Sequence, residues 1–301
     1  MKQRIETAHY SKEILISFIG FTSWSFSDAL IRSLNAYPTV LIACVSTSIS
    51  TILLCLFSQK LGGFYDTFSK PQLKLRILRG AIIACCTIFA YITFSNLDLA
   101  TAYALIFIAP FLSSIISVIL NRESVTAQSW LVIFTGFTGM LIILRPGLIP
   151  LSIGTISALL SATFFSLGFV LTRYIKKENQ TFLSMAFFQY IIVSLLTVIP
   201  AYQAYNALDP SLIFGVQQFF ITLGVSLTAL IGALMISTAY SRAPTALVAP
   251  IHYVQILWGT LLGAIFFTEY PDFWTIVGGS IIVAGGLMLI GFNKKKKRSQ
   301  D

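Results

Sequence analysis

Long apolar stretches recur from one end of the chain to the other, and they constrain its fold more than any other feature. Each has about 20 residues, enough for a helix to cross a hydrocarbon core of about 30 Å. Of the 301 residues, 56% are hydrophobic and only 10% are charged, whereas a soluble domain has about 25% charged residues. This excludes a soluble fold, because its helices need polar faces. The sequence therefore predicts an all-α polytopic membrane protein.

Ten spans are predicted, and residues that end helices separate them. They cover residues 14–34, 38–57, 78–97, 100–120, 128–144, 152–172, 183–202, 215–240, 246–267 and 273–292. The separating residues include Pro71, the pair Asp209-Pro210 and the pair Tyr270-Pro271. The first span begins near Ile14 and is one of many similar spans, so we interpret it as a retained helix and not a signal peptide. The connection from Ser95 to Asp98 is predicted to be a turn of only a few residues.

The lysines and arginines predict how the spans are oriented. With the N-terminus placed in the cytoplasm, 18 of the 20 Lys and Arg residues fall on the cytoplasmic side, and only Arg32 and Arg145 fall outside. Because positive residues gather on the cytoplasmic side of membrane proteins, both termini are predicted to be cytoplasmic in a bacterial inner membrane. The net charge of +9 is then explained by topology and by the tail from Lys294 to Arg298, and not by a nucleic-acid-binding face.

The two halves of the chain resemble each other. Ser25 precedes Arg32 by seven residues in the first span, and Ser166 precedes Arg173 by seven in the sixth. An offset of 146 residues also aligns the region between spans three and four with that between spans eight and nine. Because five spans are an odd number, the second half is predicted to be inverted in the membrane. Inverted repeats are typical of secondary transporters, although duplication can also serve only to build a stable bundle. The predicted units are residues 1–147, 148–293 and a basic tail, 294–301.

A glutamate, Glu123 or Glu269, precedes the last predicted span of each half. Ten spans in two such halves resemble the EamA-type transporters of the drug/metabolite transporter superfamily. The segments 249–259 and 267–272 are especially similar to a common bacterial subgroup, as is Leu78-Arg79-Gly80. The resemblance covers essentially the whole chain and implies the fold and a transport activity. Some members of the group resemble S-adenosylmethionine transporters, and others are taken to handle amino acids or other metabolites.

The predicted function is secondary transport of an amino-acid-like or S-adenosylmethionine-like metabolite by alternating access. The chain has no Gly-x-x-x-x-Gly-Lys-Ser/Thr run, so the energy is expected from a solute gradient, an exchanged solute or a coupled ion. The alternatives are a multidrug or toxic-metabolite exporter, a non-transporting scaffold and a membrane-embedded enzyme. An enzyme is disfavoured because His9 and His252 are the only histidines. No cofactor or metal is predicted, and the expected partners are a solute, the bilayer and at most a second copy of the chain.

The ninth predicted span holds the most informative candidates for solute binding. Pro250 removes a backbone hydrogen bond and leaves a carbonyl free to bind. His252 and Gln255 follow it on one helix face, Tyr253 and Leu257 flank that face, and Trp258 is adjacent. Polar groups beside aromatic rings suit a solute with a planar or cationic part. The alternative is that His252 and Gln255 bond only to neighbouring helices.

Asp28 is the only acidic residue well inside a predicted span. A charge in the middle of a membrane costs about 2.5–3.5 kcal/mol on insertion scales. Either Arg32, four residues on, pairs with it on one helix face, or Asp28 carries a proton or contacts a cationic group.

The remaining candidates fall into two groups. Further solute contacts are predicted at Tyr103, Phe107, Trp24, Ser25, Tyr91 and Asn96. Gate or helix-end roles are predicted for Glu123, Glu269 and Arg79, of which Arg79 stands at the cytoplasmic entrance of the third span. Glycines such as Gly136 and Gly279 are expected to allow helices to approach closely.

Overall fold

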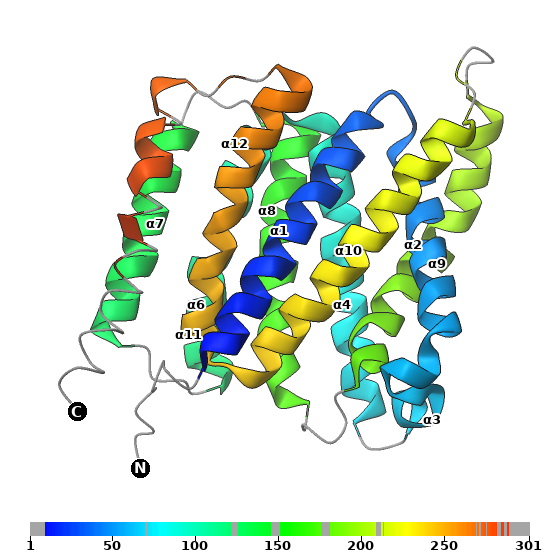
Figure 1. The fold of residues 1–301 in the computed structure, drawn as a ribbon, viewed down its shortest axis with the longest axis horizontal. Helices are drawn as coiled ribbons and strands as arrows, with labels where there is room; N and C mark the ends of the chain where they lie inside the picture. Colours follow the sequence, from blue (N-terminus) through cyan, green and yellow to red (C-terminus); the bar gives the residue numbers. More distant parts are fainter. Residues whose placement is uncertain are drawn as a thin grey trace.

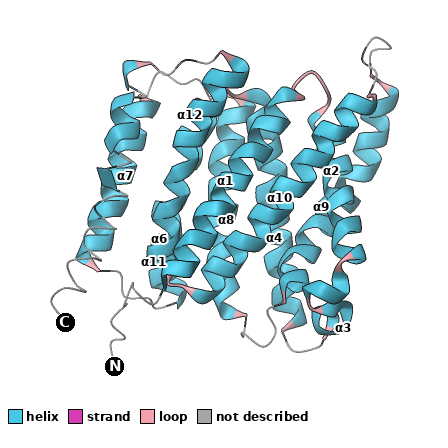
Figure 2. Ribbon diagram, in the orientation of Figure 1, coloured by secondary structure: helices cyan, strands magenta, loops and turns pink. Residues whose placement is uncertain are grey.

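The computed structural model describes residues 10–69, 72–121, 126–145, 151–175, 181–208, 212, 214–268, 270, 272–274, 276–281, 284–285 and 288. All regular secondary structure in this part of the chain is helical (Figure 2). The predicted all-α class is therefore confirmed for the described residues.

Seven helical runs in the described part are long and apolar enough to cross a membrane. They are α1 (Ser11–Ser33), α2 (Thr39–Leu56), α4 (Leu73–Asn96), α8 with the 3-10 turn η3 (Ile153–Tyr174), α9 (Phe182–Asn206), α10 (Val216–Arg242) and the run from α11 to α12 (Thr245–Phe267). These runs coincide with seven of the ten predicted spans. Between α2 and α4 lie the short helices η2 (Ser58–Leu61) and α3 (Gly63–Phe68).

The other three predicted spans correspond to shorter or partly described helices. The fourth is divided into α5 (Leu99–Ile106) and α6 (Ala109–Asn121), and the fifth is α7 (Ala127–Leu144). The tenth is described only in part, so the count of ten spans remains a prediction. The connection between α4 and α5 consists of Leu97 and Asp98, as short as predicted.

Two helical runs are broken part-way along, and each break lies beside a proline. α5 ends at Ile106, just before Pro110, whose nitrogen has no hydrogen to bond the Ile106 carbonyl. The second run consists of α11 (Thr245–Val248), the 3-10 turn η5 (Ala249–Tyr253) and α12 (Val254–Phe267), and Pro250 lies in the turn. Irregular backbone at membrane depth is tolerated where protein buries it, and Phe107 and Tyr253 at these breaks are buried.

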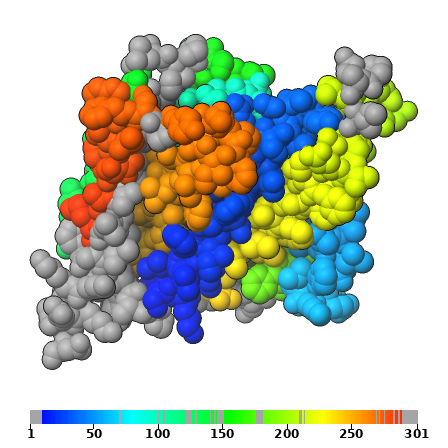
Figure 3. All heavy atoms as spheres, turned by 45° about the horizontal axis from the view of Figure 1, so that its top comes forward, coloured from blue at the N-terminus to red at the C-terminus, as the bar shows by residue number. Residues whose placement is uncertain are grey.

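The helices pack in pairs that join distant parts of the sequence. α1 lies between α10 and α12 (Figures 1 and 3), α4 packs along α8, and α2 packs along α9. The crossing of α1 and α10 requires two glycines. A Cβ atom at Gly232 would overlap the Trp24 indole and lie 2.9 Å from the Gly20 carbonyl oxygen, and one at Gly20 would lie 2.8 Å from Ile236 Cγ1. Small residues thus set how closely these helices approach.

Side chains cap the first turns of two helices in the second half. The Ser152 hydroxyl accepts a hydrogen bond from the Thr155 backbone N–H at 3.2 Å at the start of α8. At the start of α9, the Ser184 N–H donates to the Thr181 hydroxyl at 3.1 Å, and the Thr181 N–H donates to the Ser184 hydroxyl at 3.0 Å. These bonds satisfy N–H groups that have no partner within the helix.

Candidate functional site

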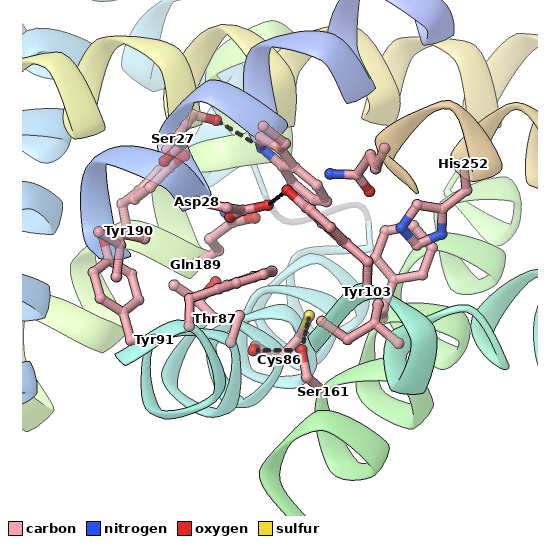
Figure 4. Close-up of a pocket in the computed structure, with 18 residues that line it drawn as sticks. Ser27, Asp28, Cys86, Thr87, Tyr91, Tyr103, Ser161, Gln189, Tyr190 and His252 are labelled. Atoms are coloured by element: carbon pink, nitrogen blue, oxygen red, sulfur yellow. Dashed lines mark hydrogen bonds between the residues drawn. The ribbon is translucent and has the colours of Figure 1, made fainter. Parts of the chain in front are cut away.

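A pocket lies between α1, α4, α5, α8, α9, α10 and the segment from η5 to α12 (Figure 4). The space that protein atoms leave unfilled, including the part open to solvent, is about 700 Å³. Six of the predicted site residues line it: Trp24, Asp28, Tyr91, Tyr103, His252 and Gln255. Residues from both halves of the sequence therefore meet in one pocket.

Asp28 is the only carboxylate among the residues that line the pocket. Its Oδ2 accepts a hydrogen bond from the Tyr103 hydroxyl of α5 at 2.8 Å. The ion pair of Arg32 is with Asp98, in the connection between α4 and α5, at an N–O distance of 2.8 Å. No lysine or arginine is among the residues that line the pocket.

His252 lines the pocket and is packed among aromatic rings. Phe21 stacks on the imidazole with ring centroids 4.6 Å apart, and Phe165 lies 4.7 Å away at an angle of 31°. The edge of Phe107 approaches at 5.7 Å. The side chain is only 2% exposed, and its Nδ1 has no hydrogen-bond partner in the described part of the chain. The surrounding aromatic rings therefore fix the position of the imidazole at the pocket.

Gln189, on α9, provides a second polar atom without a partner in the lining. It is 3% exposed, and its Oε1 accepts no hydrogen bond from the described residues. A buried polar atom without a partner costs about 1–3 kcal/mol, and such an atom is commonly found where a ligand or water binds. By contrast, the Tyr91 hydroxyl hydrogen-bonds the Ser46 hydroxyl at 2.5 Å, so Tyr91 already has a protein partner.

Five predicted solute contacts do not line the pocket: Tyr253, Phe107, Trp258, Ser25 and Asn96. Phe107 is fully buried behind Tyr103, with ring centroids 5.8 Å apart, so it supports a lining residue. The Tyr253 ring fills the space that a Cβ atom at Gly136 would need. The predicted role of Gly136 in close helix approach thus holds for α7 and η5.

The other three of these residues bond within or between helices. The Trp258 Nε1 donates to the Thr22 hydroxyl at 3.0 Å, which ties α12 to α1. The Ser25 hydroxyl donates to the Phe21 carbonyl at 3.1 Å within α1. Asn96 is exposed and donates to the Ile92 carbonyl at 2.7 Å. Their contacts are those of packing and helix-end residues.

Arg79 lies deep in the bundle and not at an open entrance. Its side chain is 1% exposed and joins α4 to three elements of the second half. Nε donates to the Thr172 hydroxyl at 3.0 Å, Nη2 donates to the Ser237 hydroxyl at 2.8 Å, and Nη1 donates to the Met185 carbonyl. The other two predicted gate residues, Glu123 and Glu269, lie outside the described residues.

Sequence reasoning missed several residues of the pocket, among them Ser27, Cys86, Ser161, Phe165, Gln189 and Tyr190. One of them did carry a signal, because Gln189 is the only amide in the predicted span 183–202. The others are hydroxyl, thiol and aromatic residues, which are frequent in membrane helices and look alike whether they face a pocket or a neighbour. Within the described residues, no three His, Cys, Asp or Glu side chains are grouped so that they could hold a metal ion.

Comparisons with known proteins are consistent across the whole chain. A sequence model of the EamA-like transporter family matches residues 11–145 and again residues 152–291. The pseudopaline exporter of Pseudomonas aeruginosa is 24% identical over 278 residues, which cover 92% of this chain and 95% of the exporter. The S-adenosylmethionine uptake transporter of Rickettsia prowazekii is 25% identical over 299 residues, which cover 91% of this chain and 98% of the transporter.

A solved crystal structure also has a similar fold. It superimposes with a TM-score of 0.68 over 95% of this chain and 98% of the other chain, at 18% sequence identity. At this identity the similarity concerns the fold alone.

Proposed function

The chain belongs to the EamA-like transporter family and is a multi-pass membrane protein, and from that premise we propose that it is a secondary transporter for a small organic solute. The observation that carries the proposal is the pocket, which is lined by residues from both halves of the sequence and contains a single carboxyl side chain among its lining residues. We place the protein in a bacterial inner membrane with both termini in the cytoplasm, as the distribution of cations predicts.

The mechanism that we propose is alternating access by two inverted five-span repeats. Three features support it. α4 and α10 end at Asn96 and Arg242, and α5 and α11 begin at Leu99 and Thr245, so both pairs of boundaries are 146 residues apart. The pairing of α1 with α10 has its counterpart in the pairing of α8 with α4.

The third feature is a contact between equivalent positions. The hydroxyls of Ser48 on α2 and Ser194 on α9 lie 2.7 Å apart, and these residues are also separated by 146 positions. A residue touches its own repeat equivalent only near the axis that relates the two halves. α2 and α9 would then flank this axis, and the two halves would exchange conformations about it.

We propose that the solute is an amino-acid-like or S-adenosylmethionine-like metabolite. Asp28 would contact a positive group, and Trp24, Phe94 and Phe165 would pack against flat or apolar parts of the solute. The pseudopaline exporter and the S-adenosylmethionine transporter among the relatives support a polar metabolite. The alternative, export of drugs or toxic metabolites, draws support from the aromatic lining. A scaffold or an enzyme is disfavoured by the family.

Transport by purified protein in proteoliposomes tests this proposal. A thermal-shift screen of S-adenosylmethionine, amino acids, nucleosides and quaternary amines first selects a compound, and its labelled form is then followed in counterflow. Asp28→Asn and His252→Ala are expected to raise the half-saturating concentration at least tenfold, since each removes a hydrogen bond of about 1.5 kcal/mol or more.

Asp98→Asn is the matched control, because this carboxylate has a side chain 61% exposed and pairs with Arg32 outside the pocket lining. It is expected to leave the half-saturating concentration within about twofold. Counterflow that is unchanged in both pocket variants would remove the site assignment. A complete lack of counterflow for every stabilising compound would count against transport itself.

A further inference from the structure

Gln189 gives the pocket a buried hydrogen-bond acceptor that no described residue satisfies. Its side chain is 3% exposed, and its Oε1 has no partner in the part of the chain that the structure describes. Burying such an atom lowers the stability of the fold by about 1–3 kcal/mol unless another group forms a hydrogen bond to it. The amide belongs to α9, whereas the pocket carboxylate belongs to α1.

Asp28 and Gln189 both line the pocket. In the view of Figure 4 they are drawn next to each other, with Tyr91 and Tyr190 to one side and His252 beyond Tyr103 on the other. Both side chains present acceptor oxygens, and the lining contains no lysine or arginine to donate to them. Two acceptor oxygens, one of them on a carboxyl group, are complementary to a single positive group that has at least two N–H bonds.

We therefore propose that the pocket selects organic cations with N–H donors, such as a primary ammonium or a guanidinium, and that Gln189 determines this selectivity. The inference rests on the proposed function for its site, but it concerns which solutes bind there. A quaternary ammonium of equal charge is attracted by Asp28, yet it has no hydrogen for the Gln189 oxygen and leaves that oxygen unsatisfied. Sites with buried polar groups discriminate strongly against ligands that leave those groups unpaired.

The opposite side of the pocket suits an aromatic or apolar body. Phe165 and His252 line the pocket there, and Phe21 and Phe107 pack against the imidazole. A ligand with an ammonium at one end and a ring at the other would fill both sides. Tyramine is a suitable probe, and its N,N,N-trimethyl derivative differs only in lacking N–H donors and in the size of its head group.

The experiment compares the affinities of these two probes by thermal stabilisation of the full-length protein. The two cations differ in hydration, so the decisive quantity is how the affinity ratio, tyramine over the trimethyl probe, changes from wild type to Gln189→Met. We expect this affinity ratio to be at least about tenfold lower in the variant than in wild type, the equivalent of one hydrogen bond to a charged group. The affinity for the trimethyl probe should stay within about twofold. Gln203→Met, an exposed position on the same helix, should leave the ratio unchanged.

An equal ratio in wild type and Gln189→Met would overturn the inference, and so would a wild type that neither probe stabilises. If Gln189→Met does not fold, Gln189→Glu keeps the side-chain length and strengthens the acceptor. It should raise the ratio, and an unchanged ratio would again contradict the inference. Binding with the expected ratio but without any counterflow would instead refute the proposed transport and leave the selectivity of the pocket intact.

Discussion

Replacing Arg79 tests how the inner structure of the bundle is held together. Its guanidinium donates to Thr172, Met185 and Ser237, and thereby connects α4 to η3, α9 and α10. Its Cζ also lies 5.5 Å from the centre of the Phe169 ring. We compare Arg79→Met, which removes the charge, with Arg79→Lys, which keeps it.

The two variants are expected to differ because burial of a charge is costly without enough partners. The Arg79→Met substitution removes three hydrogen bonds, but it also removes the free-energy cost of burying the charge. The acceptors keep other bonds, such as the one from the Thr172 hydroxyl to the Gly168 carbonyl. We expect Arg79→Met to lower the free energy of unfolding by about 1–3 kcal/mol. Lysine cannot reach three separated acceptors with one nitrogen, so Arg79→Lys should cost about 3–5 kcal/mol.

Unfolding by sodium dodecyl sulfate in mixed micelles measures these free energies. Arg242→Lys is the matched control, because this arginine is exposed at the end of α10, and it should change the free energy of unfolding by less than about 0.5 kcal/mol. We expect the free energy of unfolding to be lower in Arg79→Lys than in Arg79→Met. A lysine variant as stable as wild type, or more stable than the methionine variant, would refute it.

The same variants bear on alternating access, since the Arg79 bonds join the two sequence halves. If the halves separate at this end during transport, all three bonds must break. Loss of 1–3 kcal/mol from the closed state would raise the open population about 5- to 150-fold. The reaction rate of Cys86 in the pocket, with the other cysteines replaced, reports this population. An unchanged rate in Arg79→Met would show that opening does not break these bonds.

Three further predictions follow from packing and from the repeat. Gly232→Ala should lower the free energy of unfolding by about 1–3 kcal/mol, because the added methyl overlaps an indole, whereas Gly279→Ala, with no described atom within 4 Å of the new Cβ, should change it by less than about 0.5 kcal/mol; equal effects would contradict the packing. Tyr103→Phe should cost about 1–3 kcal/mol in the same assay, because the pocket carboxylate loses its 2.8 Å hydrogen bond, and unaltered stability would exclude that bond. Ser48→Cys combined with Ser194→Cys should form a cross-link under oxidation in a background without native cysteines, because the hydroxyls lie 2.7 Å apart, and counterflow should persist; a cross-link that stops transport would exclude an exchange axis at this pair.

The sequence by itself determined that the chain is a helical membrane protein and where most of its helices lie. A helix satisfies its backbone hydrogen bonds locally, and the apolar run that crosses a bilayer is a continuous stretch of sequence. Seven predicted spans therefore correspond to long helices, and the short connection between α4 and α5 was predicted. Family resemblance was likewise readable from sequence, because it rests on residue identities along the chain.

The membership of the pocket was only partly predictable. Asp28 stands out as an acidic residue inside a predicted span and His252 as a polar residue beside Pro250, and both line the pocket. Trp258 and Tyr253 belong to the same predicted span as His252 but pack elsewhere. Spacing along one helix shows which residues share a face, but it does not show which neighbouring helix packs against that face.

Only the tertiary structure decided which side chains meet. It pairs Arg32 with Asp98 in the connection between α4 and α5, although Asp28 is nearer in sequence and on the same helix. It also brings Gln189 to the pocket that holds Asp28. Hydropathy fixes that a helix crosses the membrane, but not its rotation or crossing angle. Those depend on close packing between helices, such as the contact of α1 with α10 at Gly20 and Gly232, and so the chemistry of the pocket is a property of the assembled bundle.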